Sequence, residues 1–210
     1  MRPIRNQTTM IVWHCSATAP DWNGHVADID RMHRDRGWDS IGYHLVISRE
    51  GDMQWGENPR RWGAHAKGHN SHSIAVCMVG GVDADGKPEN NFTAEQWESA
   101  ALAYRFLSRV YPSAEHVGHR DLSPDLDGDG RIEAHEFMKG CPCFSVSEWI
   151  DGDLQPVANL YAPWEIDDTS ELPKPKPSKK RAKKAKKVQD DEDASKDDES
   201  GEEGSVSESS

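Results

Sequence analysis

The stretch Ser73-Ile-Ala-Val-Cys-Met-Val79 is a near-continuous apolar run that ends at Gly80-Gly81. A run of this length without polar alternation is typical of a strand that is buried on both faces of a sheet. Such strands lie in the middle of sheets that helices cover on both sides. The run therefore predicts the central strand of an α/β domain.

Further strands are expected around this centre. The β-rich run Met10-Ile-Val-Trp-His-Cys-Ser16 leads into a polar loop, and residues 115–119 form a short extended segment. Residues 41–47 alternate in polarity, so one face of a strand is expected to carry Ile41, Tyr43, Leu45 and Ile47. Glu50-Gly51-Asp52 then predicts a turn into a hairpin partner that extends to Trp55.

Helices are expected between these strands. Residues 26–36 carry apolar side chains at helical spacing and stop at Gly37. Thr93 and Gln96 form a capping box at the start of the clearest helix. Its apolar stripe is predicted to consist of Trp97, Ala101, Tyr104, Leu107 and Val110. With a short closing helix at 146–150, the pattern predicts a single α/β domain with a central mixed sheet flanked by helices.

Charge and apolar content divide the chain into two parts. The 210 residues include 25 Lys and Arg against 37 Asp and Glu, a formal net charge of −12. Residues 165–210 contain 14 acidic and 10 basic residues, only seven apolar ones and no aromatic ones. Such a segment cannot offset its conformational entropy by burial, so a disordered charged tail is expected at 165–210 and one domain at 1–164.

Composition also excludes several classes of protein. No run approaches the roughly 18 apolar residues of a membrane span, and no apolar segment follows the N-terminus, so neither a span nor a signal peptide is expected. The four cysteines then favour free thiols or metal ligands over disulfides. The acidic balance is unfavourable for binding nucleic acid, and no specific nucleic-acid partner is expected.

Three residues are candidates for a zinc site: His14, His119 and Cys141. Two imidazoles and one thiolate suit Zn²⁺, and three protein ligands leave a fourth position for water, as in catalytic sites. The ligands are 105 and then 22 residues apart, however, and a chain with ten histidines offers many such triples. From spacing alone, the alternative is a core histidine, a loop histidine and a buried thiol.

Six motifs in a fixed order favour the zinc site. Together they closely resemble the phage lysozyme type of N-acetylmuramoyl-L-alanine amidase, the type-2 amidase family that shares its fold with peptidoglycan recognition proteins. The resemblance covers about residues 8–151. The motifs are Ile11-Val-Trp-His-Cys-Ser-Ala-Thr18, Gly37-Trp-Asp-Ser-Ile-Gly-Tyr-His44, Gly63-Ala-His-Ala-Lys-Gly-His-Asn70, Ser73-Ile-Ala-Val-Cys-Met-Val-Gly-Gly81, Gly118-His-Arg-Asp121 and Lys139-Gly-Cys-Pro142.

The resemblance implies a zinc-dependent hydrolase that cuts the amide bond between N-acetylmuramic acid and L-alanine. The family's zinc ligands correspond to His14, His119 and Cys141. Its catalytic tyrosine corresponds to Tyr43 and its catalytic lysine to Lys139, which without the resemblance would be taken for a core tyrosine and a solvated lysine. His65 falls in a loop that lines the substrate groove of relatives, so substrate contact is expected there.

The other cysteines and one more histidine are expected to have structural roles. Cys15 and Cys77 are interpreted as inert buried thiols. Cys143 could compete with Cys141 for zinc, but the Lys-Gly-Cys-Pro match favours Cys141. His44 alternates with Tyr43 along the predicted strand and is expected to be packed.

A second metal site is expected in an insertion between His119 and Lys139. The twelve residues Asp125-Leu-Asp-Gly-Asp-Gly-Arg-Ile-Glu-Ala-His-Glu136 match the calcium-loop pattern D-x-D-x-D-G-x₅-E. The expected Ca²⁺ ligands are Asp125, Asp127, Asp129, the carbonyl of Arg131, Glu133 and Glu136. Pro124 argues against a full incoming helix, so the loop is EF-hand-like, with an acidic surface turn as the alternative. Bound Ca²⁺ is expected to order the insertion and to set Lys139 and Cys141 in place.

The resemblance implies a peptidoglycan hydrolase, a phage endolysin. Because no signal peptide is visible, synthesis in the bacterial host cytoplasm is expected. A separate holin-type pore-forming partner would release it to the cell wall, and a monomer is expected. The alternative is a non-catalytic peptidoglycan-binding module. The presence of Cys141, Tyr43 and Lys139 argues against that alternative, because binding alone needs no activated water.

Overall fold

The computed structural model describes residues 1–157, and the predicted tail at 165–210 lies outside the described residues. The strands are β1 (Met10–Cys15), β2 (Leu45–Ile47), β3 (Met53–Trp55), β4 (Ser73–Met78) and β5 (Glu115–Gly118). The helices are α1 (Val26–Asp35), α2 (Ala94–Val110) and α3 (Val146–Asp151), with 3₁₀ helices η1 (His119–Leu122) and η2 (Ala134–Glu136).

The five strands form one mixed sheet in the order β3-β2-β4-β1-β5. β4 pairs in parallel with both β1 and β2, β1 pairs in parallel with β5, and β2 pairs antiparallel with β3. All six residues of β4 are buried. The predicted central strand, the hairpin and the mixed sheet are confirmed.

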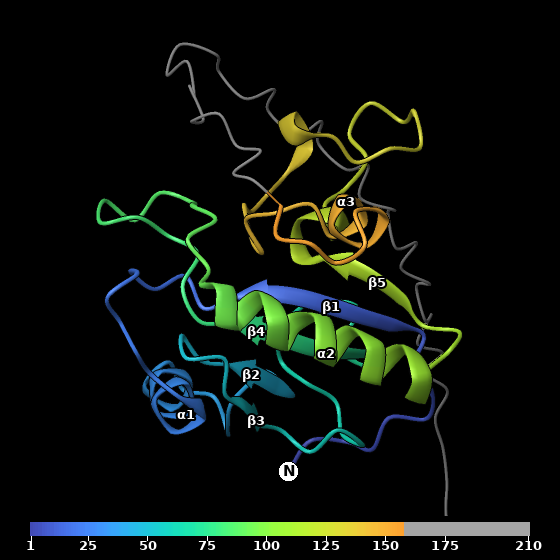
Figure 1. The fold of residues 1–210 in the computed structure, drawn as a ribbon. Coiled ribbons are helices and arrows are strands. Elements are labelled where there is room, and N and C mark those ends of the chain that lie inside the picture. The colour runs from blue at the N-terminus through green and yellow to red at the C-terminus, as the bar shows by residue number, and fades with distance from the viewer. Residues whose placement is uncertain (158–210) are drawn as a thin grey trace, which may run out of the picture. The chain divides into compact units, whose positions relative to one another are not determined.

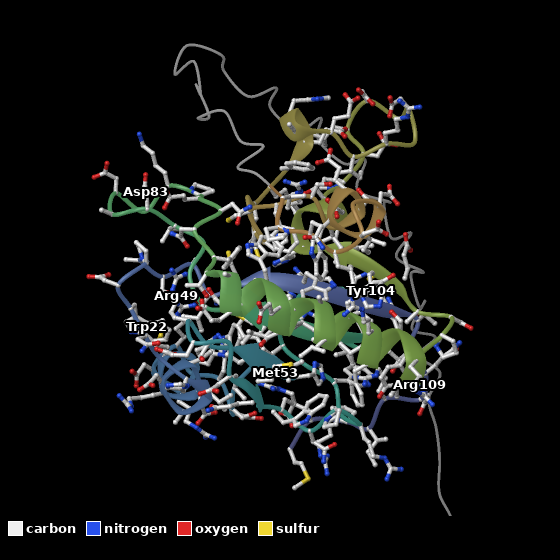
Figure 2. All side chains as sticks on the ribbon, viewed as in Figure 1. Trp22, Arg49, Met53, Asp83, Tyr104 and Arg109 are labelled. Carbon is white, nitrogen blue, oxygen red and sulfur yellow. The ribbon has the colours of Figure 1, made fainter. Side chains whose placement is uncertain are left out.

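The two faces of the sheet have different partners. Figure 1 shows α2 lying across one face and α3 close to β5. On this face Ile11 and Trp13 of β1 join the main core, where the Trp13 ring meets the Trp149 ring edge-on at 4.9 Å. Tyr104 lies between α2 and β5, its ring 4.5 Å from that of His116 (Figure 2). Because side chains alternate along a strand, His14 points to the opposite face, where α1 packs.

The start of α2 is fixed to the sheet by a buried amide. Thr93 Oγ1 accepts from Gln96 N, and Gln96 Oε1 accepts from Thr93 N, both at 3.1 Å, so the capping box is confirmed. Gln96 is fully buried, and its Nε2 donates to the carbonyl oxygens of Ile47 (3.2 Å) and Val79 (2.8 Å). Arg49, labelled at this end of α2 in Figure 2, donates to Gln96 Oε1 at 3.2 Å.

Replacing Gln96 by alanine is expected to lower the free energy of unfolding by about 2–4 kcal/mol. The substitution removes the Gln96 half of the capping box, while Thr93 Oγ1 still accepts from the backbone N–H of residue 96. It also takes the buried amide donor away from two carbonyl oxygens. Urea unfolding followed by circular dichroism measures the loss. Glu98→Ala, an exposed change on the same helix, is the control and should stay within about 0.5 kcal/mol of the wild type. An equally small change for Gln96→Ala would contradict the stabilising role given to the buried Gln96 amide.

The strand predicted for residues 41–47 is shorter than expected, because only its last three residues form β2. Before residue 45, side chains of α1 accept hydrogen bonds from the backbone N–H groups of residues 41 and 42. Asp30 Oδ1 accepts from Ile41 N at 2.7 Å, and His33 Nδ1 accepts from Gly42 N at 3.0 Å. These contacts draw the segment towards α1.

The prediction that residues 41, 43, 45 and 47 share one face is therefore wrong. Leu45 and Ile47 belong to the core under α2, whereas Ile41 and Tyr43 pack on the α1 side of the sheet. This is also the side of His14, whose ring centroid lies 5.2 Å from that of Tyr43. The early end of the strand brings Tyr43 towards the candidate site.

Two smaller expectations also change. The apolar stripe of α2 holds for its first four positions, but Val110 in the last turn is 48 % exposed. The extended segment 115–119 ends one residue early, because His119 begins η1.

Within residues 1–157, no helix combines the length and apolar character needed to cross a membrane.

Candidate metal centre

Three side chains of types that can bind metals meet near the carboxyl ends of β1 and β5. Trp13 is paired with Gly118 in the parallel register of these strands, so the next residues, His14 and His119, are neighbours. Their ring centroids are 4.6 Å apart. The possible ligand atoms of His14, His119 and Cys141 all lie within 4.8 Å of one another. One cation can therefore reach all three.

Backbone contacts hold Cys141 in this position. Arg120 N, on η1, donates to the Cys141 carbonyl at 2.8 Å. Cys15 N, at the end of β1, donates to the Cys141 sulfur at 3.2 Å, and that sulfur lies 3.7 Å from His14 Nδ1. The third candidate ligand is thus tied to both strand ends that supply the other two.

Burial controls the charge of the three candidate ligands. It lowers the pKa of His14 well below the usual 6.5, and the neighbouring His65 lowers it further. Burial, with Lys139 as the second cause, lowers the pKa of His119 to about 4. Burial also raises the pKa of the Cys141 thiol. Both imidazoles are therefore neutral, with a lone pair available, and a cation that binds here would displace the thiol proton.

Lys139 and Tyr43 flank the three donors. Lys139 lies two residues before Cys141 and lines a cavity of about 160 Å³ together with His65 and His119. Tyr43 lies with its ring beside that of His14. Burial raises the pKa of Tyr43 well above 10, so its phenol remains a hydrogen-bond donor at neutral pH. A cationic group and a phenol are thus available next to the donors.

His65 touches the centre directly. Its Nδ1 lies 3.0 Å from His14 Nε2, and its Nε2 lies 3.2 Å from Ser73 Oγ. Burial lowers the pKa of His65 well below 6.5, so this ring is also neutral. His65 also lines the cavity. Its contact with the substrate stays a prediction. The contact with Ser73 was missed from the sequence, where Ser73 is only the first residue of a buried strand.

The remaining thiols lie outside the group of three. Cys15 and Cys77 are buried, as expected. The Cys143 sulfur donates to the Gly81 carbonyl at 3.0 Å and lies 3.8 Å from the Cys15 sulfur. Cys143 is therefore directed away from the candidate centre. His44 is fully buried, and its Nδ1 accepts a backbone N–H of β4 at 2.9 Å, so it is packed as expected.

The predicted calcium loop brings some of its expected ligands together. Two groups of side chains there have possible ligand atoms within 4.8 Å of one another. One group is Asp125, Asp127 and Glu136, and the other is Asp127, Glu133 and His135. Asp129 lies outside both groups. His135 was not expected, because the sequence pattern leaves its position free.

Glu136 organises this loop from within. It is only 2 % exposed, and its carboxylate accepts from the backbone N–H groups of Leu126, Asp127 and Glu133. The loop projects from the rest of the domain at the top of Figure 1. Its base is closed by a bond of 3.1 Å from Met138 N to Ser123 Oγ. Lys139 follows this closure directly.

An open mixed sheet with a His, His, Cys group at the carboxyl ends of parallel strands, and a lysine beside it, fits a metal-dependent hydrolase. Comparison with known proteins agrees with this class. The model of the N-acetylmuramoyl-L-alanine amidase family (Amidase_2) matches residues 4–142, and the chain belongs to this family. It is accordingly an enzyme, an amidase that hydrolyses peptidoglycan.

Individual relatives cover most of the described residues. The endolysin of Enterobacteria phage K11 is 36% identical over 146 residues, which are 70% of this chain and 87% of that protein. The endolysin of Escherichia phage T7 is 37% identical over 145 residues, 69% of this chain and 87% of that one. Among solved structures, the N-acetylmuramoyl-L-alanine amidase LysC from Clostridium intestinale URNW is 25% identical, with a TM-score of 0.54 over 70% of this chain and 85% of that chain.

Proposed function

We propose that the protein is a zinc-dependent endolysin that hydrolyses the amide bond between N-acetylmuramic acid and L-alanine in peptidoglycan. The convergence of His14, His119 and Cys141 within 4.8 Å, beside a cavity lined by Lys139, carries this proposal. Membership of the amidase family and the similarity to phage endolysins support it.

The donor set fits zinc. Zn²⁺ prefers imidazole nitrogen and thiolate sulfur, and three protein ligands leave one position open, as catalytic zinc sites require. His14 and His119 are neutral at physiological pH, as metal ligation requires. When bound, zinc polarises a substrate carbonyl and lowers the pKa of a bound water to about 7.

Two side chains of the chain itself are assigned catalytic roles. Hydrolysis of an amide builds negative charge on the carbonyl oxygen, and the Lys139 ammonium, which lines the cavity with His119, stabilises that charge. Tyr43 keeps its phenol proton and lies beside His14, so it donates a hydrogen bond to the attacking water or to the leaving group. Neither role requires either side chain to change its net charge.

The bond that is cut identifies the activity. Purified cell walls treated with the protein should gain free amino groups of L-alanine and no new reducing ends of sugars. Mass spectrometry of the native protein should find zinc bound to the chain. Wall binding without new amino groups would favour the alternative, a non-catalytic peptidoglycan-binding module, and would overturn the proposal.

The proposal includes a route to the wall. Similarity to phage endolysins supports synthesis in the cytoplasm of a bacterial host, followed by release through a holin-type pore. The protein would act on the wall as a monomer.

We also propose that the insertion holds one Ca²⁺ ion. Calcium takes carboxylate and carbonyl oxygens from twelve-residue loops of this pattern. The carboxylates of Asp125, Asp127 and Glu136 already lie together, which supports the assignment. Because the base of the loop precedes Lys139 directly, ordering of the loop by Ca²⁺ would help to position Lys139 and Cys141.

The double substitution Asp127→Ala, Glu136→Ala is expected to reduce wall hydrolysis by about tenfold to a hundredfold, because small displacements of catalytic groups are costly. Zinc content should not change. Selective calcium chelation should have the same effect on the wild type, and added Ca²⁺ should reverse it. Asp52→Ala, Glu98→Ala removes two exposed acids elsewhere and serves as the control. Full activity in the loop variant would contradict the assignment.

A further inference from the structure

We propose that His65 is a positioning residue, which fixes the tautomer and orientation of the candidate ligand His14 through a hydrogen-bond chain that ends on the His69 carbonyl. The inference rests on the proposed zinc site and adds a residue outside the three ligands. The chain consists of His14, His65, the Ser73 hydroxyl and a backbone carbonyl oxygen.

The direction of this chain is set at its far end. The Ser73 hydroxyl has one proton and donates it to the carbonyl oxygen of His69 at 2.7 Å. Towards His65 Nε2, 3.2 Å away, the hydroxyl can then only accept. We therefore assign the single N–H of the neutral His65 ring to Nε2, which leaves a lone pair on Nδ1.

The tautomer of His14 follows from that of His65. Its Nε2 lies 3.0 Å from His65 Nδ1, which is an acceptor, so the N–H of His14 is assigned to Nε2. The lone pair of His14 is then on Nδ1. This is the nitrogen that lies 3.7 Å from the Cys141 sulfur, on the side of the candidate centre. The hydrogen-bond chain thus presents to the cation the one nitrogen that can bind it.

The surroundings hold His65 firmly. Ser73 is fully buried at the start of β4. Asn70 Oδ1 accepts from the backbone N–H groups of His65 (2.9 Å) and Ala66 (3.0 Å), which fixes the loop that carries the ring. A Cβ at Gly63 would lie only 2.5 Å from His65 Cδ2, so glycine leaves the space that the ring occupies. These contacts define one orientation of the His65 ring and therefore of its acceptor atom, Nδ1.

Residues that orient metal ligands have a measurable energetic effect. A ligating histidine normally donates its other N–H to a fixed acceptor, and losing that partner costs about 10- to 100-fold in metal affinity. This role differs from the substrate contact predicted for His65 from the sequence. A pure substrate contact would alter KM and leave zinc affinity unchanged.

Zinc affinity in two His65 variants separates these roles. His65→Phe keeps the bulk of the ring and removes the acceptor, so competition with a chelator should show zinc binding weakened by about 10- to 100-fold. His65→Gln restores an acceptor oxygen and should recover most of the loss. The control is His116→Phe, because His116 bonds Trp13 and Ser108 and should leave zinc affinity unchanged. Wild-type affinity in His65→Phe would overturn the proposal.

Nuclear magnetic resonance tests the tautomer without any metal. Long-range proton–nitrogen spectra of the metal-free protein should show the His14 proton on Nε2 in the wild type and a mixture of tautomers in His65→Phe. A wild-type proton on Nδ1 would overturn the inference. If the wild type binds no zinc, the proposed function fails, whereas this spectrum still decides the role of His65.

Discussion

Cys141→Ser is expected to reduce wall hydrolysis by about a thousandfold or more, since a catalytic metal contributes several kcal/mol to transition-state stabilisation and each 1.36 kcal/mol is about tenfold in rate. Cys141 supplies the only sulfur among the three donors. A serine hydroxyl does not ionise readily enough to replace a thiolate ligand. Zinc content should fall together with activity.

The neighbouring thiol gives a matched control for this experiment. Cys143 is buried two residues further on, and its sulfur donates to the Gly81 carbonyl instead of facing the donors. Cys143→Ser should therefore keep its zinc and most of its activity. A Cys141→Ser protein as active as the wild type would overturn the zinc mechanism. Equal losses in both variants would indicate a folding defect.

Lys139→Ala is expected to lower kcat by about 10²- to 10³-fold, the usual effect of removing one group that stabilises an oxyanion. The Lys139 side chain lines the cavity beside His119 but contributes no ligand atom to the group of three. Zinc content should therefore remain at the wild-type level. A fall in kcat with zinc retained would distinguish a catalytic role from a structural one.

Steady-state kinetics on a soluble muramyl peptide, with metal analysis of the same sample, measures both quantities. Lys87→Ala removes an exposed lysine from another loop and should leave kcat unchanged. Lys139→Arg keeps the positive charge and should recover part of the rate. Unchanged kcat in Lys139→Ala would show that this lysine is a solvated surface residue.

The parts of the fold that were predicted correctly depend on local sequence. The uninterrupted apolar run of β4 and the capping box of α2 are encoded within a few residues each, and both were found. The break before β2 depends on Asp30 and His33 of α1, which bond the backbone of Ile41 and Gly42 about ten residues later in the chain. Such side-chain partners leave no trace in the alternation of residues 41–47.

The candidate site also has parts that could be predicted from local sequence and parts that depend on distant contacts. His14 and His119 become neighbours through strand register, and family motifs were needed to select them from ten histidines. The chain from His65 to Ser73 depends on ring orientations and on one hydroxyl proton, which no spacing rule encodes. The acidic loop was located from its motif, but the approach of His135 to Asp127 was not.

The alternation along β1 has a practical consequence for preparing the protein. Trp13 points into the main core and His14 points towards the candidate ligands, and the two residues are adjacent. A shift of one residue in the pairing of β1 would move the tryptophan out of the main core to the α1 side and bury the histidine among apolar groups, so this error would be costly. A misregistered chain would thus lose its core and its metal donors together. Stoichiometric zinc uptake would therefore serve as a quality test for refolded samples.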